Sequence, residues 1–139
     1  MSWIFLSLLS AFFAALVAIL GKLGIKEIDS TLATGVRAAV MAVAMLIAVT
    51  ALGKWKFVST IDGRALSFIV MSGLAGALSW LFYFLALKSG KAASVAAVDR
   101  LSVVFVLILA TLFLGELATV KSWLGAALIV IGAILMVLG

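Results

Sequence analysis

Apolar residues fill five long runs of this sequence, and the charged residues gather in the short segments between the runs. A helix that crosses the hydrocarbon core of a bilayer needs about 20 consecutive, predominantly apolar residues, and each run is close to that length. The pattern therefore predicts five transmembrane helices, at about residues 3–21, 32–52, 64–87, 93–115 and 120–138.

The connections between the runs are short, with between four and eleven residues each. Each helix must therefore run antiparallel to the one before it. Transmembrane strands would need alternating apolar and polar residues, whereas residues 126–138 are continuously apolar. Asp29, Ser30 and Thr31 offer N-cap oxygens for the second helix. We expect an all-α integral membrane protein with a single five-helix transmembrane domain over residues 1–139.

The composition supports this interpretation. Apolar residues make up 68% and charged residues 11% of the 139 residues, and the mean hydropathy is +1.46. A soluble domain has about 45–50% apolar and about 25% charged residues. The composition thus excludes a soluble enzyme, a secreted domain and a nucleic-acid-binding protein. The lipid bilayer is the first partner that we expect, and the cell membrane (inner or plasma membrane) is the expected location of this multi-pass protein.

The residue types that the sequence lacks narrow the chemistry further. It contains no Cys and no His, which excludes a disulfide framework, a thiol nucleophile, a zinc site and a histidine proton relay. It also has no Walker phosphate-binding motif. We therefore expect no catalytic residue, no metal and no cofactor, and we do not expect an enzyme.

Basic residues are almost balanced between the two sides of the predicted bundle. The first and third connections hold Lys22, Lys26, Lys88 and Lys91, and the opposite side holds Lys54, Lys56, Arg64 and Lys121. Arg37 and Arg100 enter their spans from the first side and change the balance only slightly. Because an excess of Lys and Arg sets orientation, two alternatives stand. The chain has one fixed orientation, or it has dual topology, with copies inserted both ways.

Three short motifs follow one another in the second half of the chain. They are Leu-Ala-Leu-Lys at residues 85–88, Phe-Leu-Gly-Glu at residues 113–116, and a last helix that contains Gly125 and Gly132. In order and spacing they resemble the EamA-type repeat of the drug/metabolite transporter superfamily. The resemblance covers essentially the whole chain.

Three charged positions bear on how far this resemblance extends. The family often has an arginine early in the second helix, where this chain has Arg37. At Asp99 and Arg100 the chain departs from the apolar residues and the proline that are usual in the family. The distant small multidrug resistance proteins couple export through a glutamate in the first helix, where this chain has no acidic residue. Neither the substrate of a typical member nor that coupling mechanism is therefore transferred to this chain.

The resemblance implies a secondary transporter or exporter of a small metabolite or drug-like molecule. Family members typically contain two repeats, and the odd number of helices in each repeat inverts the second. Inverted repeats around a midplane site are a common basis of alternating access. This chain corresponds to one repeat, a half-size member, so the resemblance implies an antiparallel homodimer. The alternative is a non-transporting membrane subunit or a half-transporter partner in a hetero-oligomer.

Four polar side chains fall in one layer of the predicted spans. Arg37, Tyr83, Asp99 and Arg100 lie about 6–9 Å from their span centres, toward the same side. Charges within spans are costly and usually mark function. In a functional interpretation Asp99 binds a cation, a proton or a substrate amine, and Arg37 or Arg100 holds a carboxylate. In a structural one, Asp99 forms a neutralising salt bridge with Arg37 or Arg100. The two coexist if substrate breaks the bridge.

Four further residues are candidates for specific roles. Trp80 and Tyr83 share a face of the third helix with small residues, and they either line a substrate cavity or pack against a neighbouring helix. Glu116 either caps the start of the fifth helix, where a negative charge is favourable, or takes part in transport. Gly125 and Gly132 lie on one side of the fifth helix and favour close helix approach, in the dimer or within the chain.

Overall fold

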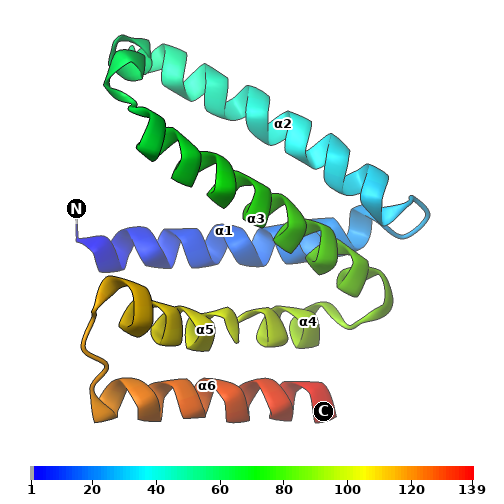
Figure 1. The fold of residues 1–139 in the computed structure, drawn as a ribbon. Helices are drawn as coiled ribbons and strands as arrows, with labels where there is room; N and C mark the ends of the chain where they lie inside the picture. Colours follow the sequence, from blue (N-terminus) through cyan, green and yellow to red (C-terminus); the bar gives the residue numbers. More distant parts are fainter. Residues whose placement is uncertain (1) are drawn as a thin grey trace. The chain divides into compact units, whose positions relative to one another are not determined.

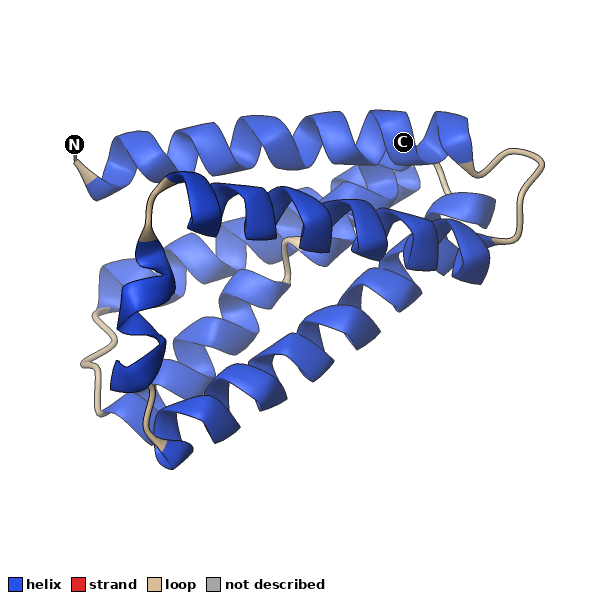
Figure 2. Cartoon of the chain, turned by 90° about the horizontal axis from the view of Figure 1, so that it is seen from above, coloured by secondary structure: helices blue, strands red, loops and turns tan. Residues whose placement is uncertain are grey.

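The computed structural model describes residues 2–139, and every regular element in them is a helix (Figures 1 and 2). In chain order the elements are α1 (Trp3–Gly24), α2 (Ser30–Ala51), η1 (Lys54–Thr60), α3 (Gly63–Ser89), α4 (Ala92–Asp99), α5 (Ser102–Leu109), η2 (Ala110–Leu114) and α6 (Val120–Leu138). Of the two short elements, η1 is a 3₁₀-helix and η2 is a π-helical turn.

Five helical stretches are long and apolar enough to cross a membrane. They are α1, α2, α3, the combined stretch Ala92–Leu114 and α6. Their ends lie within three residues of the predicted spans. The prediction of an all-α protein with five membrane-spanning stretches is therefore confirmed.

The fourth span differs from the single continuous helix that its apolar run predicted. It consists of α4, α5 and η2, with an interruption at Arg100 and Leu101. The span ends at Gly115, whose φ of 68° is left-handed. Glycine adopts this conformation without steric cost, which gives the Phe-Leu-Gly-Glu motif a structural reason.

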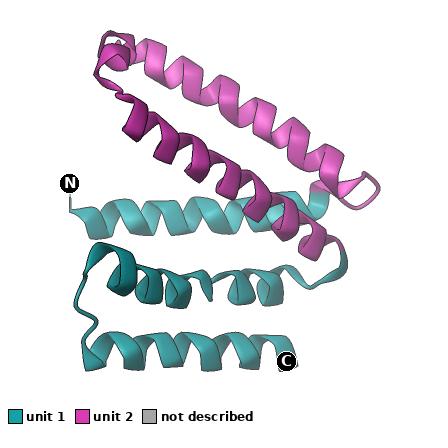
Figure 3. Ribbon diagram, viewed as in Figure 1, with its two compact units in different colours: residues 1–23, 89–139 teal, residues 24–88 magenta. Residues whose placement is uncertain are grey.

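The chain forms two compact units, which Figure 3 colours separately. Unit 1 contains residues 1–23 and 89–139, and unit 2 contains residues 24–88. Unit 1 thus joins the first span to the fourth and the fifth, although most of the sequence between them belongs to unit 2.

In unit 1, α6 packs along α4 and α5. The Ser94 hydroxyl donates a hydrogen bond of 2.8 Å to the Met136 carbonyl oxygen, which links the start of α4 to the end of α6. The Lys22 ammonium group donates one of 2.9 Å to the Gly90 carbonyl oxygen, just before α4. In both Figures 1 and 2, α1 begins at one end of unit 1 and α6 finishes toward the other. This arrangement is what an odd number of crossings requires.

Unit 2 is a helical hairpin in which η1 joins α2 to α3 (Figure 3). The Asp29 carboxylate accepts a 2.9 Å hydrogen bond from the Leu32 backbone N–H, so the predicted N-cap of α2 is confirmed. In the connection between the helices, the Trp55 indole N–H donates a 2.9 Å hydrogen bond to the Thr50 hydroxyl. This bond ties η1 to the last turn of α2.

Most large apolar side chains lie on the surface, and small residues are prominent among those that are buried. In residues 2–139 the buried apolar residues are Ala18, Ile25, Phe84, Leu87, Ala126 and Ala133. Large aliphatic side chains are exposed along every span. Such a distribution suits a lipid solvent, which is as apolar as these side chains, so that helix packing depends on small residues.

The two neighbouring alanines Ala126 and Ala127 of α6 test this packing. Ala126 is buried and Ala127 is exposed. We expect Ala126→Leu to destabilise the protein by about 1–3 kcal/mol, because the added methyl groups have no space. Ala127→Leu adds the same groups toward lipid, and its effect should stay within about 0.5 kcal/mol.

Thermal unfolding in detergent micelles measures both variants. A melting temperature of Ala126→Leu equal to that of Ala127→Leu would show that the α6 contact does not limit stability.

Candidate functional site

The guanidinium group of Arg37 lies over the ring of Trp80 in unit 2. The distance from the guanidinium carbon to the ring centroid is 3.6 Å. Arg37 comes from the second turn of α2 and Trp80 from α3, so this contact joins the two arms of the hairpin. A cation over the face of a tryptophan is attracted by the ring quadrupole, and the attraction grows when water is excluded.

Two further aromatic rings of α3 complete an aromatic cluster around this stack. The Tyr83 ring lies 5.5 Å from the Trp80 ring and nearly perpendicular to it. The Phe84 ring lies 6.1 Å from the Trp80 ring and 5.6 Å from the Arg37 guanidinium carbon. The structure thus brings together three candidate residues of the sequence analysis, Arg37, Trp80 and Tyr83. It adds a fourth residue, Phe84, to the cluster. Phe84 follows Trp80 by four residues, a spacing that places both on one helix face.

Arg37 and Trp80 also lie at similar depths in their helices. If each span is centred on the bilayer, Arg37 is about 5 Å and Trp80 about 6 Å from the midplane, on the side of the first and third connections. With the spans centred in this way, the stack holds a positive charge well inside the hydrocarbon region.

The edge of the Arg37 guanidinium group is not used within unit 2. No residue of unit 2 accepts a hydrogen bond from it, and none of its unbonded nitrogens is sealed from the surface. An arginine has five N–H donors in the guanidinium plane. The face is engaged by Trp80, and the donors on the edge are available.

Asp99 and Arg100 lie where the fourth span is interrupted in unit 1. Up to Arg100 the backbone N–H groups of α4 donate to the carbonyl oxygens four residues earlier. The Arg100 N–H, for example, donates a 3.2 Å hydrogen bond to the Ala96 carbonyl oxygen. Beyond it, Leu101 bonds to Val98 at 2.9 Å, three residues back, and Val103 and Val104 repeat this shorter pattern. Neither proline nor glycine occurs here to explain it. A 3₁₀ turn in the middle of a helix often marks a hinge or a functional site.

The interruption leaves backbone carbonyl groups unpaired. Across it, no backbone hydrogen bond within residues 2–139 reaches the carbonyl oxygens of Ala97 and Asp99. Irregular backbone at membrane depth is tolerated where it is buried in protein or lines a water-filled cavity. The 3₁₀ turn in the fourth span is therefore a suitable place for a polar site.

The side chains of Asp99 and Arg100 are both exposed on the chain. They form no ion pair with each other in the described residues, as expected for neighbours that project about 100° apart on a helix. Arg37 belongs to the other unit, and its pairing with Asp99 stays a prediction. An apolar cavity of about 170 Å³ lies beside the interruption, between Val98, Leu101 and the end of α6.

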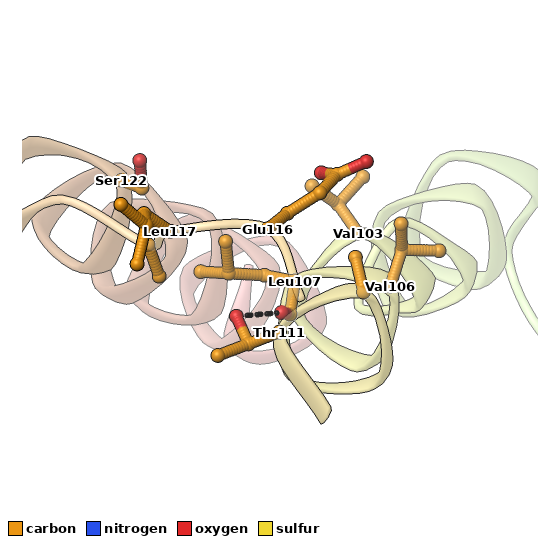
Figure 4. Close-up of a pocket in the computed structure, with 9 residues that line it drawn as sticks. Val103, Val106, Leu107, Thr111, Glu116, Leu117 and Ser122 are labelled. Carbon is orange, nitrogen blue, oxygen red and sulfur yellow. Dashed lines mark hydrogen bonds between the residues drawn. The ribbon is translucent and has the colours of Figure 1, made fainter. Parts of the chain in front are cut away.

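A second cavity of about 250 Å³ lies in unit 1 near the other end of the fourth span (Figure 4). Its walls are mainly apolar side chains of α5, η2 and the connection to α6. The Thr111 hydroxyl in its lining donates to the Leu107 carbonyl oxygen at 2.8 Å, the bond drawn in Figure 4. The Glu116 carboxylate points away from Thr111 and Ser122 in this view.

The hydrogen-bonding cap of α6 is a residue that the sequence analysis did not name. Thr119 is the N-cap, and its hydroxyl accepts a 3.2 Å hydrogen bond from the Ser122 N–H. Glu116 does not make this bond, because it lies three residues before Thr119, at the end of the fourth span. Threonine is a favoured N-cap residue. The position of Thr119 immediately before the last apolar run is the sequence signal that identifies it as the cap.

The two glycines of α6 face open space. An added Cβ at Gly125 or Gly132 would meet no atom within 4 Å. The alanines next to them, Ala126 and Ala133, are buried. Close packing in unit 1 therefore uses the alanines.

A comparison with protein families shows the family of the chain. Residues 1–138 match the model of the EamA-like transporter family. The chain belongs to the EamA-like transporter family. It is accordingly a multi-pass membrane transporter and not an enzyme, as predicted.

One relative of this EamA-like transporter has nearly the same length. It is a protein of Sinorhizobium sp. described as "Uncharacterized transporter in cobO 3'region", 48% identical over 135 residues. The match covers 97% of this chain and 96% of the relative. No solved structure matches the chain. In residues 2–139 no group of three or more His, Cys, Asp or Glu residues is placed to hold a metal ion.

Proposed function

We propose that the chain is a secondary transporter or exporter of a small metabolite or drug-like molecule. It works by alternating access, as an antiparallel homodimer of single repeats. The observation that supports this proposal most directly is the odd number of spans, with α1 beginning and α6 finishing at opposite ends of unit 1. A second copy inserted upside down supplies the inverted repeat around which many secondary transporters alternate. The near balance of basic residues between the two sides favours such dual insertion.

The substrate and ion site lies in the layer of Arg37, Trp80, Tyr83, Asp99 and Arg100. The cost of a charge inside a membrane supports this assignment. The 3₁₀ turn at Arg100 and Leu101 supports it too, since such a turn in the middle of a helix often marks a functional site. Asp99 binds the coupling cation, a proton or a substrate amine. An ion gradient supplies the energy, because the chain has no Walker motif.

The open side of α6 is the proposed dimer contact. Gly125 and Gly132 lie seven residues apart, and a Cβ added at either would meet no atom of the described part of unit 1 within 4 Å. Glycines spaced in this way let the backbones of two transmembrane helices approach closely.

Gradient-driven flux in liposomes tests the transport proposal, and Asp99→Asn tests the site. We expect the purified wild-type protein to accumulate a member of a broad metabolite panel when a proton or sodium gradient is imposed. Asp99→Asn should insert normally and abolish flux, because it removes the only carboxylate within the spans. Asp62→Asn, a matched change before α3, should retain flux. Wild-type rates in Asp99→Asn would remove Asp99 from the mechanism, and absence of flux across the whole panel would favour a non-transporting subunit or a half of a hetero-oligomer.

Single cysteines test the antiparallel arrangement, since the chain has no Cys of its own. Lys26→Cys reports on the first connection and Ser59→Cys on the second, and both positions are exposed. If copies insert both ways, a membrane-impermeant maleimide added to intact cells should label about half of each variant. A permeant maleimide should label all of it. Labelling of one variant only, with the other fully protected, is the result of one fixed orientation and would exclude the antiparallel homodimer.

A further inference from the structure

We infer that the Arg37 and Trp80 stack is a binding site for a monoanionic carboxylate, so that the transported molecule carries one carboxylate group. The inference rests on the proposed transport function and names the substrate class of its site. In this stack Trp80 covers the face of the guanidinium group, and the edge is open.

The face of the guanidinium group is already engaged. Trp80 covers it at 3.6 Å, and Phe84 approaches within 5.6 Å of the guanidinium carbon. These contacts use the π-face and consume no N–H donor. They fix the plane of the group, because stacking restrains a planar cation against the rigid ring of a helix-bound tryptophan.

The edge of the same group is preorganised for a planar acceptor. Its N–H donors have no acceptor in unit 2, and none of its unbonded nitrogens is sealed off. Two parallel N–H donors match the two oxygens of a carboxylate in a bidentate pair. Because Trp80 has already fixed the orientation of Arg37, less side-chain entropy is lost on binding.

The charge of the ligand follows from the depth of the site. A single positive charge a few Å from the midplane is costly until it is neutralised. At the Arg37 and Trp80 stack a monoanion cancels this charge. A dianion leaves one negative charge that no second cation of the stack neutralises, and an ammonium group adds repulsion. A neutral amide can form hydrogen bonds with the edge but leaves the charge unpaired. We therefore expect a monoanionic carboxylate to bind with the highest affinity. A dianion, an amide and an amine should each bind more weakly.

Trp80 itself reports on binding. Substituting Trp3, Trp55 and Trp123 by Phe leaves Trp80 as the sole tryptophan. We would titrate this protein in lipid nanodiscs with phenylacetate, phenylacetamide, phenethylamine and dianionic benzylphosphonate, which share a phenyl group and differ in charge. Trp80 fluorescence should respond saturably to phenylacetate. Each of the other three probes should bind at least about tenfold more weakly, since a charge-assisted pair exceeds a neutral one by roughly this factor.

Substitutions then locate the effect. Arg37→Gln should weaken phenylacetate binding at least about tenfold, and Arg37→Lys should weaken it less, because lysine keeps the charge and loses the planar fork. Arg64→Gln removes an arginine at the start of α3 as a matched control and should leave binding unchanged. Equal affinity for all four probes in the unsubstituted Arg37 protein, tighter binding of benzylphosphonate, or unchanged affinity in Arg37→Gln would each overturn the inference. If the Arg37 variants fail to fold, the relative affinities of the four probes still test the carboxylate site.

The binding titration tests the carboxylate site and the liposome flux assay tests the transport proposal, so the failure of one can be told from the failure of the other. If phenylacetate binds in the expected order while liposomes show no flux, the carboxylate site stands and the transport proposal fails. If liposomes show gradient-driven flux while the probes bind equally, the carboxylate site fails and the transport proposal stands.

Discussion

The hydrocarbon core of a bilayer offers no hydrogen-bond partner, and the structure follows from this constraint. The backbone satisfies itself in helices, the large apolar side chains point outward, and small residues such as Ala126 and Ala133 are left for packing. Polar groups that stay inside need a partner in the protein or in its ligand. In unit 2 the face of the Arg37 cation has Trp80, and in unit 1 an interrupted helix carries Asp99 and Arg100. These two exceptions to an otherwise apolar chain are where the function is proposed to lie.

The spans were predictable because length and apolarity determine a transmembrane helix almost alone. Asp29 was recognisable as a cap, because an acidic residue stood before an apolar run. The interruption at Arg100 was not predictable, since its usual signals, proline and glycine, are absent. Thr119, which accepts the capping hydrogen bond of α6, was overlooked, because the charge of Glu116 drew attention from it.

The candidate site was predictable in its parts and not in its geometry. Depth along each helix put Arg37 and Tyr83 in one layer, but depth does not determine which side chains face one another. The contact between Arg37 and Trp80 depends on how α2 and α3 are rotated in the hairpin. Phe84 was overlooked, because a phenylalanine in an apolar run has no distinguishing feature until its neighbours are known.

The central claim is that an arginine is held on a tryptophan ring inside the membrane, with its donors open to a ligand. NMR of the ¹⁵N-arginine-labelled protein in lipid nanodiscs tests it directly, since the chain has only three arginines, Arg37, Arg64 and Arg100. We predict that one of the three Nε–H signals is shifted upfield by the ring current of Trp80 and returns to its ordinary position in Trp80→Leu. Three unshifted signals that Trp80→Leu leaves unchanged would contradict the account.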